Sequence, residues 1–189
     1  MILEGIVTTL APDGAVNIAP MGPAVDDAMQ RFTLRPFPTA QTYSNLCCHG
    51  EGVLHVTDDV LLLARAAVGS VEPTPELTHA ICVRGFILAG ACRYYEFRVV
   101  SIDDSEPRVR IEVEVVHSGR LRDFFGFNRA KHAVVEAAIL ATRIHLLPRE
   151  EIESEFRKLG VIVGKTGGPQ EREAFDFLVD YVATAGGPT

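Results

Sequence analysis

The sequence predicts an α+β fold, with a β-rich part over residues 1–118 followed by a helical part over residues 119–189. Up to residue 118, short segments with alternating polar and apolar residues are separated by turn-forming residues, which is typical of strands. Beyond Gly119, one alanine-rich segment and two segments that open with proline and acidic residues are typical of helices. A run of strands followed by a run of helices favours α+β over a doubly wound parallel sheet.

The β-rich part is predicted to begin with a hairpin. Ile2–Leu10 and Ala15–Met21 are its strands, and Pro12-Asp13-Gly14 supplies the turn between them. A third strand is predicted over Arg31–Phe37, where polar and apolar residues alternate until two prolines, at positions 36 and 38, end it.

The rest of the β-rich part alternates short helices, strands and loops. Helices are predicted over Thr39–Leu46, with Thr39 as the N-cap, and over Val60–Val68, capped by Asp58 or Asp59. The other predicted elements are, in chain order, strand Gly50–Thr57, surface loop 70–77, strand Ala89–Ile102, hairpin loop 103–107 and strand Arg108–His117. In the last strand the alternating valines and Ile111 are predicted to face one side, and Arg110, Glu112 and Glu114 the other.

Three helices are predicted in the helical part: Asn128–Arg143, a helix that starts at Pro148, and Pro169–Ala183. Small apolar residues cover most of the first helix, which indicates burial on more than one side, as at a domain or subunit contact. Its polar stripe is interpreted as a solvated face, with Arg129 or Glu136 lining a polar pocket as the alternative. The stripe consists of Arg129, His132, Glu136 and Arg143.

Composition and charge exclude several classes of protein. The chain of 189 residues and 20.6 kDa fits one domain, or a domain with a smaller appendage, and its 47% hydrophobic and 23% charged residues exclude disorder as the main state. A net charge of −7 argues against a general nucleic-acid binder. The N-terminus lacks the basic region of a signal peptide, and no apolar run approaches the ~20 residues that span a bilayer. These features predict a soluble cytoplasmic protein without nucleic-acid or membrane partners.

Motifs for metal or nucleotide chemistry are incomplete. The four cysteines include no C-x-x-C pair and are predicted to be reduced thiols. The run Cys47-Cys48-His49, with His55 nearby, does not converge on a helix, so no metal site is predicted. Gly164–Gly168 resembles the end of a Walker A loop without its required first glycine, and is interpreted as a flexible loop between helices. Neither G-x-G-x-x-G nor G-x-S-x-G occurs.

One segment of the β-rich part carries the candidate binding site. Arg35 is a permanent cation with a forked set of donors suited to phosphate. Thr39 and Thr42 add hydroxyl groups near a helix N-terminus, where backbone N–H groups favour anions. Pro20 and Gly22 expose backbone and leave room for a flat group. This chemistry suits a ligand with an anionic tail and a planar head.

The same region resembles the FMN-binding split-barrel superfamily. Gly14–Pro20, Gln41–Leu46 and Gly52–Thr57 are similar to the G-x-x-N-x-A-P strand, the T-x-x-N helix and the following strand of its flavin-reductase-like members. A family of uncharacterised archaeal and bacterial proteins within that superfamily resembles the chain nearly end to end. Its motifs occur here as Ala19–Gly22, Arg35–Thr39, Val56–Asp59 and Phe127–Arg143.

The resemblance implies a split β-barrel with a helical C-terminal subdomain, and a homodimer with FMN at the dimer interface. It implies phosphate contacts from the region of Arg35, Thr39 and Thr42, and isoalloxazine contacts from Ala19–Gly22. The cofactor-binding residues predicted on this basis are Asn17, Ala19, Pro20, Met21, Gly22, Arg35, Thr39, Thr42 and Asn45. Flavin reductases often have Lys-Asp-Thr where this chain has Ala40-Gln41-Thr42, so Arg35 is the main candidate cation and NAD(P)H-dependent flavin reductase activity is less strongly implied.

The predicted function is that of an FMN-binding oxidoreductase with an unknown small-molecule substrate or electron donor. The isoalloxazine would carry the redox chemistry, and no residue stands out as a catalytic acid or base. Met21 or a residue of the partner subunit is predicted to wall the substrate space. Phe37 and Phe127 are predicted to pack in the core or, alternatively, to stack on the flavin ring or close the pocket. Two other functions stay open: a non-catalytic flavin carrier, sensor or scaffold, and a pterin- or one-carbon-related binding protein without flavin.

Overall fold

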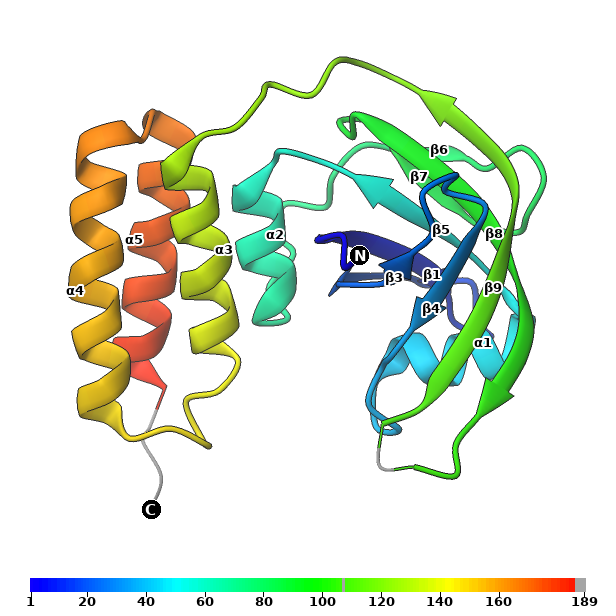
Figure 1. Ribbon diagram of the computed structural model, residues 1–189, viewed down its shortest axis with the longest axis horizontal. Helices are drawn as coiled ribbons and strands as arrows, with labels where there is room; N and C mark the ends of the chain where they lie inside the picture. Colours follow the sequence, from blue (N-terminus) through cyan, green and yellow to red (C-terminus); the bar gives the residue numbers. More distant parts are fainter. Residues whose placement is uncertain (107, 186–189) are drawn as a thin grey trace. The chain divides into compact units, whose positions relative to one another are not determined.

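The computed structural model describes residues 1–106 and 108–185 and contains two compact units (Figure 1). Unit 1 comprises Met1–Thr57 and Pro73–Phe124, and unit 2 comprises Asp58–Glu72 and the chain from Phe125 onward. The domain division predicted from the sequence, at residue 118, places residues 58–72 with the strands, whereas the structure groups them with the helices. Pro107 of the predicted hairpin loop and residues 186–189 of the predicted helical part lie outside the described residues.

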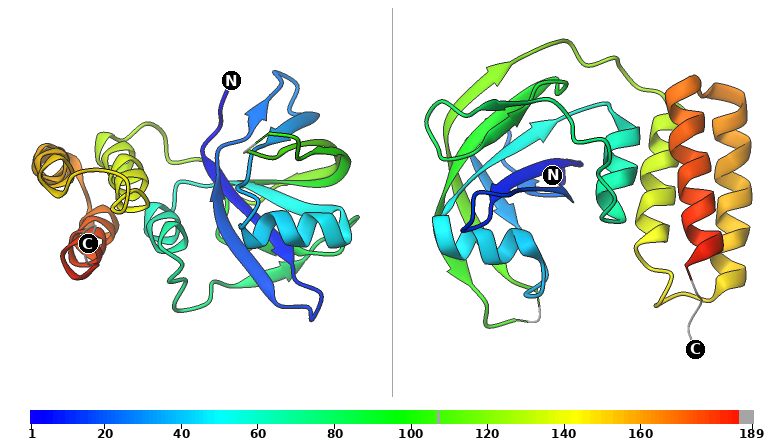
Figure 2. Two further views of the ribbon diagram at one scale, coloured as in Figure 1. Left: turned by 90° about the horizontal axis from the view of Figure 1, so that it is seen from below. Right: turned by 180° about the vertical axis from the view of Figure 1, so that it is seen from behind.

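Unit 1 is built on a seven-stranded antiparallel sheet with the strand order β2-β1-β5-β8-β9-β4-β3 (Figure 1). Its strands are β1 Gly5–Leu10, β2 Val16–Met21, β3 Ala24–Val25, β4 Arg31–Leu34, β5 Glu51–Val56, β8 Arg93–Asp103 and β9 Arg110–Arg120. A small second sheet, which the sequence did not predict, pairs β6 Leu77–His79 with β7 Phe86–Leu88. The helix α1, Gln41–His49, contacts β1 and β2 and lies across one end of the curled sheet (Figures 1 and 2).

The two edges of the large sheet meet because β2 and β3 form one bent strand, which pairs with the start of the chain along its whole length and with β4 at its β3 end. β2 and β3 pair with the start of the chain in a single register, in which Gly5 lies opposite Met21 and Ile2 opposite Ala24. On its other side β3 pairs with β4, where Ala24 lies opposite Thr33. Within the described residues β2 has no strand on its other side. The barrel is therefore closed along β3 and open along β2.

The barrel core follows the alternation that the sequence shows. Ile111 and Val113 of β9 are at most 1% exposed, and their neighbours Arg110 and Glu114 are exposed on the other face, as predicted. Leu46 of α1 reaches the same core and is 1% exposed. Full burial of an aliphatic side chain stabilises a fold by about 1.5–3 kcal/mol, so Leu46 helps to hold this helix against the sheet.

Local predictions near α1 need two corrections. The N-cap of α1 is Ala40, without a side-chain hydrogen bond, so the prediction of Thr39 as the cap is wrong. Strand β4 ends at Leu34, before the predicted end at Phe37. Pro36 has no N–H for a ladder bond and restricts the residue before it, which explains the early end of the strand.

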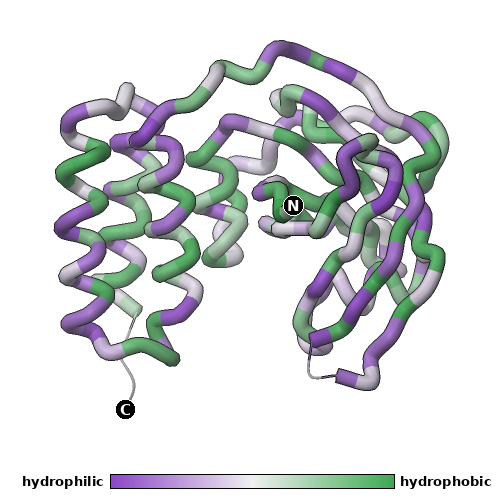
Figure 3. Tube along the Cα trace, in the orientation of Figure 1, coloured by the Kyte–Doolittle hydropathy of each residue, from purple (hydrophilic) through white to green (hydrophobic). Residues whose placement is uncertain are grey.

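The described residues of unit 2 form four helices, α2 Val60–Ala67, α3 Arg129–Ala141, α4 Arg149–Thr166 and α5 Pro169–Thr184. Figure 3 shows hydrophobic residues recurring along each of them, as expected for helices that bury one face. Gly164–Thr166 forms the last turn of α4, so the interpretation of that segment as part of a loop is wrong. Among the described helices, none has the length and hydropathy that a membrane span requires.

Helix α3 is buried on more than one side, as its composition predicts. Ala130, Val134 and Ala137 are fully buried, and α3 contacts α2, α4 and α5. Its surface is therefore covered by helices of the same unit and does not by itself require a second subunit. Arg129 and Glu136 are exposed, in keeping with a solvated face.

Candidate functional site

Asn17, Thr42 and Asn45 are joined by a hydrogen-bond network beneath α1. The Thr9 hydroxyl accepts bonds from Asn45 Nδ2 at 2.9 Å and from Asn17 Nδ2 at 3.3 Å. Asn17 Nδ2 also donates to the Thr42 hydroxyl at 3.0 Å, and Gln41 Nε2 donates to Asn45 Oδ1 at 2.7 Å. Thr9, Thr42 and Asn45 are at most 2% exposed. Their polar groups therefore fix the start of α1 against the β1–β2 hairpin.

Thr9 is the member of this network that sequence reasoning missed. The pair of threonines at the end of the first predicted strand was its only signal, and threonine is common in strands for its shape alone. A buried hydroxyl needs partners, and here two amide side chains distant in the chain supply them.

Two backbone hydrogen bonds fix the alternation along β2. Ala11 N–H donates to Ala15 O at 2.9 Å beyond one end of the ladder, and Leu3 N–H donates to Pro23 O at 3.0 Å beyond the other. In an antiparallel ladder, residues alternate between directing both backbone groups toward the partner strand and directing both away. With this register, the backbone N–H and C=O groups of the odd-numbered residues of β2 point toward β1, and those of the even-numbered residues point toward the open edge.

The open edge of β2 thus presents the N–H and C=O of Ile18 and the C=O of Pro20. Proline has no N–H, and it occupies a position where the ladder requires none. The side chains at Ala19 and Pro20 are compact, and all six residues of β2 are partly exposed. A flat group with its own donors and acceptors can bond to such an edge as an added strand would.

The close approach of the N-terminal segment explains why position 22 is a glycine. A Cβ at this position would lie 3.1 Å from Ile2 Cγ2 and 3.2 Å from Glu4 Oε1. The glycine lets the start of the chain pass closely at the bend between β2 and β3.

The N-terminus of α1 lies beside the start of this edge. The N-cap Ala40 offers no side-chain bond, and the first turn contains no acidic residue. Uncapped N–H groups at a helix start carry partial positive charge and suit an anion. Asn17 and Gln41 also line a cavity of about 530 Å³ together with residues of the β1–β2 turn.

Arg35 lies in a different cavity of about 320 Å³. Arg108 and Arg110 also line it, as do the acidic side chains of Asp103 and Glu106. The described residues that line this cavity and those that line the cavity at Asn17 form two separate sets. The structure therefore does not unite Arg35 with the network beneath α1. Thr39, which lies between Arg35 and Thr42 in the sequence, is exposed.

Phe37 and Phe127 do not pack in a core, so that prediction is wrong for both. Phe37 is 57% exposed, and the guanidinium of Arg108 lies 4.5 Å from its ring centroid. Phe127 is 94% exposed and stacks on His132, with 6.1 Å between ring centroids.

His55 is fully buried and is held by two backbone groups. Its Nδ1 lies 3.1 Å from Ile6 O, and Leu88 N–H donates to its Nε2 at 3.1 Å. These partners require the neutral tautomer with the proton on Nδ1, which donates to Ile6 O. Burial lowers the pKa of His55 to about 4. Both ring nitrogens are thus engaged within unit 1, and His55 has a structural role.

Two of the motifs that carry the family resemblance meet in unit 2. Lys131 Nζ donates to the backbone oxygen of Asp58 at 2.7 Å and pairs with Glu171 Oε1 at 2.8 Å. The Asp58 carboxylate accepts from Phe125 N–H at 2.7 Å, and Asn128 caps α3 by accepting from Lys131 N–H. Asp58 of the V-T-D-D segment and Lys131 of the F-N-R-A-K segment therefore belong to one hydrogen-bonded cluster.

The ion pair in this cluster is buried. The side chains of Lys131 and Glu171 are 14% and 9% exposed. Burial raises the pKa of Glu171, but hydrogen bonds from Lys131 and from the Gly168 N–H outweigh it and hold the pKa below its ordinary value. The pair links the start of α3 to the start of α5, so its role is to stabilise unit 2.

Replacing Lys131 by methionine should destabilise unit 2 by about 3–5 kcal/mol, because the Glu171 carboxylate would stay buried without its cation. Urea unfolding followed by far-UV circular dichroism measures this loss. The double variant Lys131→Met, Glu171→Gln should recover much of it, since no unpaired charge remains. A single variant as stable as the wild type would show that the pair contributes nothing.

Two family models match the chain. The model described as "Protein of unknown function (DUF447) N-terminal domain" matches residues 3–122, and the model described as "Protein of unknown function (DUF447)" matches residues 128–180. Among curated protein sequences, none matches the chain.

Solved structures share the fold. An FMN-bound protein from Methanosarcina mazei is 22% identical, with a TM-score of 0.82 over 95% of this chain and 94% of that chain. The 2-nitrobenzoate 2-nitroreductase of Pseudomonas fluorescens is 20% identical, with a TM-score of 0.53 over 62% of this chain and 64% of that one. The flavin reductase of the styrene monooxygenase from Pseudomonas putida S12 is 14% identical, with a TM-score of 0.52 over 64% of this chain and 82% of that one. The predicted α+β split barrel with C-terminal helices is confirmed.

Proposed function

Because the chain belongs to the DUF447 family of proteins of unknown function, we propose that it is an FMN-binding flavoprotein. The observation that carries the proposal is the open edge of β2 beside the uncapped start of α1. The FMN-bound protein of Methanosarcina mazei has the same fold over nearly the whole chain, which supports it.

The β2 edge fits the flat end of FMN. The pyrimidine side of isoalloxazine alternates carbonyl oxygens with nitrogen atoms that donate or accept. The outward N–H of Ile18 and the outward C=O groups of Ile18 and Pro20 complement such a pattern. Ala19 and Met21 direct their backbone toward β1, so they would contribute through side chains, with Met21 as a wall of the substrate space.

The phosphate end of FMN has two candidate positions in the chain. The uncapped N-terminus of α1, at Gln41 and Thr42, lies beside the edge of β2. The cavity that contains Arg35 has more cations and lies apart from the network beneath α1. We assign the phosphate to the Arg35 region, because a guanidinium binds phosphate through paired charged bonds and a helix terminus alone supplies only a partial charge.

We also propose a homodimer with FMN at its interface. A partly exposed edge strand such as β2 invites pairing or coverage by another chain, and a second copy would exclude water from the bound ring. When bound, the isoalloxazine supplies the redox chemistry, and an oxidoreductase acting on a small molecule follows from it. This chain binds the ring, orients it along β2 and leaves space for a substrate beside Met21.

The visible spectrum of the freshly purified protein, before and after desalting, tests the flavin. A flavin band that stays with the protein supports the proposal, and its loss on addition of NADH or NADPH without oxygen supports the oxidoreductase. Retained flavin that no donor reduces would favour the non-catalytic carrier. A colourless protein that does not perturb the spectrum of added FMN, but binds a pterin, would overturn the flavin assignment.

Replacing Arg35 by alanine should weaken FMN binding about ten- to a hundredfold, because a charged hydrogen bond to phosphate is worth roughly 1.5–3 kcal/mol. Titration with flavin fluorescence as the signal measures the dissociation constant. Arg31→Ala is the matched control, since Arg31 is an exposed arginine at the start of β4, four residues before Arg35, and does not line the cavity. Equal affinities in the two variants would exclude Arg35 as the phosphate ligand.

A further inference from the structure

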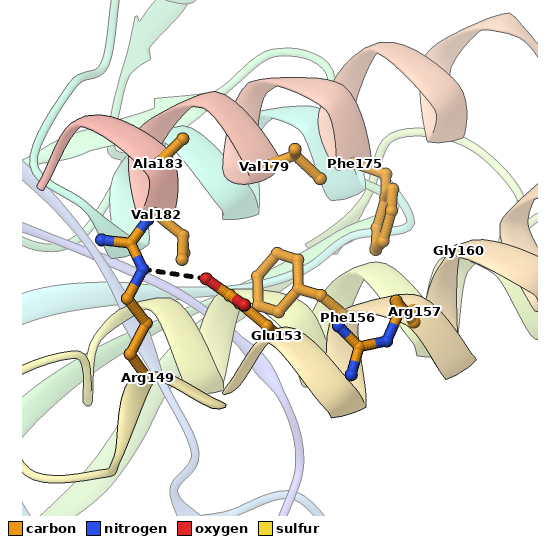
Figure 4. Close-up of a pocket in the computed structure, with 9 residues that line it drawn as sticks. All are labelled: Arg149, Glu153, Phe156, Arg157, Gly160, Phe175, Val179, Val182 and Ala183. Carbon is orange, nitrogen blue, oxygen red and sulfur yellow. Dashed lines mark hydrogen bonds and ion pairs between the residues drawn. The ribbon is translucent and has the colours of Figure 1, made fainter. Parts of the chain in front are cut away.

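Unit 2 contains a groove that the proposed flavin site leaves unexplained. It lies between α4 and α5 and has a volume of about 460 Å³, within the range of small-molecule sites. Figure 4 shows the side chains of Phe156 from α4 and of Phe175 and Val179 from α5 directed into it. The lining is mostly apolar, with charged groups from α4 alone.

Two phenyl rings form the floor of the groove. Phe156 and Phe175 are each 8% exposed, and their ring centroids lie 5.7 Å apart with an angle of 33° between the ring planes. A flat apolar group can contact the exposed parts of both rings, which favours aromatic ligands over aliphatic chains.

A glycine in the interior of α4 lets the ring of Phe175 lie close to the helix where it lines the groove. A Cβ at Gly160 would lie 3.2 Å from Cε1 of Phe175, closer than ordinary van der Waals contact. Glycine costs about 1 kcal/mol relative to alanine within a helix, so a local reason for its presence is expected. Here that reason is the close approach of the Phe175 ring to α4.

The charges along the groove leave one cation available. Arg149 Nε and Glu153 Oε1 form an ion pair at 2.8 Å and neutralise each other. Arg157 is exposed, and among the described residues no hydrogen bond or ion pair involves its side chain. Figure 4 shows Arg157 on the same helix as Phe156 and near Gly160. The groove therefore offers an apolar floor and one unpaired guanidinium.

The geometry points to a binding site for a small aromatic carboxylic acid in this groove. The aromatic body packs on Phe156 and Phe175, and the carboxylate pairs with the fork of Arg157. A single available cation matches a monoanion better than a phosphate dianion, which would need a second unpaired partner. The site belongs to unit 2 by itself and does not depend on the flavin proposal.

Titration of the full chain with 2-naphthoate, with and without added FMN, tests this site. We expect saturable binding of one naphthoate per chain that FMN does not displace. Arg157→Gln should weaken it about ten- to a hundredfold, as the loss of a charged pair predicts. Lys158→Gln is the matched control: it removes a neighbouring exposed cation that pairs with Glu155 and does not line the groove, so its affinity should stay within about twofold.

Two further measurements separate the groove from other sites. Gly160→Leu fills the space beside Phe175 and should abolish binding while the helical circular dichroism signal is kept. The uncharged analogue 2-naphthalenemethanol should bind more weakly than naphthoate, and Arg157→Gln should not change its affinity. Absence of saturable binding up to roughly millimolar concentration, equal affinity in Arg157→Gln, or competition with FMN would overturn the site. Dimer dissociation by Gly160→Leu would overturn it too, since a second copy would then occupy the groove.

Discussion

Replacing Ile18 by proline should weaken FMN binding about ten- to a hundredfold while the barrel stays folded. The register of β2 directs the Ile18 N–H away from β1, so proline removes no ladder bond and only the bond proposed for the flavin. Leaving an acceptor atom of the bound flavin without this donor should cost roughly 1–3 kcal/mol of binding free energy. Flavin fluorescence titration gives the affinity, and urea unfolding checks the stability.

The neighbouring position supplies the contrast for this experiment. Ala19 directs its N–H toward β1, so Ala19→Pro should break the ladder and lower the free energy of unfolding. Ile18→Val keeps the backbone group and should bind FMN like the wild type. If Ile18→Pro binds FMN as tightly as Ile18→Val, the ring does not lie along the β2 edge.

His55 alone should make the stability of unit 1 fall by roughly 3 kcal/mol between pH 7 and pH 4. The pKa of His55 is about 4 in the folded chain, against 6.5 as its ordinary value. As the pH falls below 6.5, the unfolded chain takes up a proton that the folded chain refuses. The stabilisation present above pH 6.5 is therefore lost progressively down to pH 4.

Urea unfolding at several pH values between 7 and 4 measures this slope. Carboxylates titrate in the same range, so the comparison is with His55→Gln, which should be less stable at pH 7 and should have a shallower slope. His79→Gln, at an exposed histidine of the same unit, should keep the wild-type slope. Identical slopes in the wild type and His55→Gln would contradict the assignment of a buried neutral imidazole.

The sequence was most informative where structure depends on near neighbours. The alternation around Ile111 and Val113 predicted a buried strand face, and the small residues of Asn128–Arg143 predicted a helix buried broadly. Both patterns are read within a few residues, because side chains recur every 2 residues in a strand and every 3.6 in a helix. The start of α5 at Pro169 was predicted from equally local information, because proline favours the first position of a helix.

The candidate site was only partly accessible to such reasoning. Family motifs singled out Asn17, Thr42 and Asn45, and the structure does join these three side chains. Thr9, which accepts from both Asn17 and Asn45, was not singled out. Its place in the network, and the burial of the network, depend on how α1 lies on the hairpin. Arg35 was grouped with them for its guanidinium and because the family resemblance implies phosphate contacts from this region, whereas in the structure Arg35 lines a separate cavity.

The sequence by itself determined most of the longer elements, the α+β class and the family. Only the tertiary structure decided that Ile2 meets Ala24 to close the barrel, that β2 remains an open edge, and that Lys131 meets Glu171 forty positions away. Local conformation follows from side chains a few residues apart. Strand register and helix packing follow from contacts between distant residues, which leave no periodic signal in the chain.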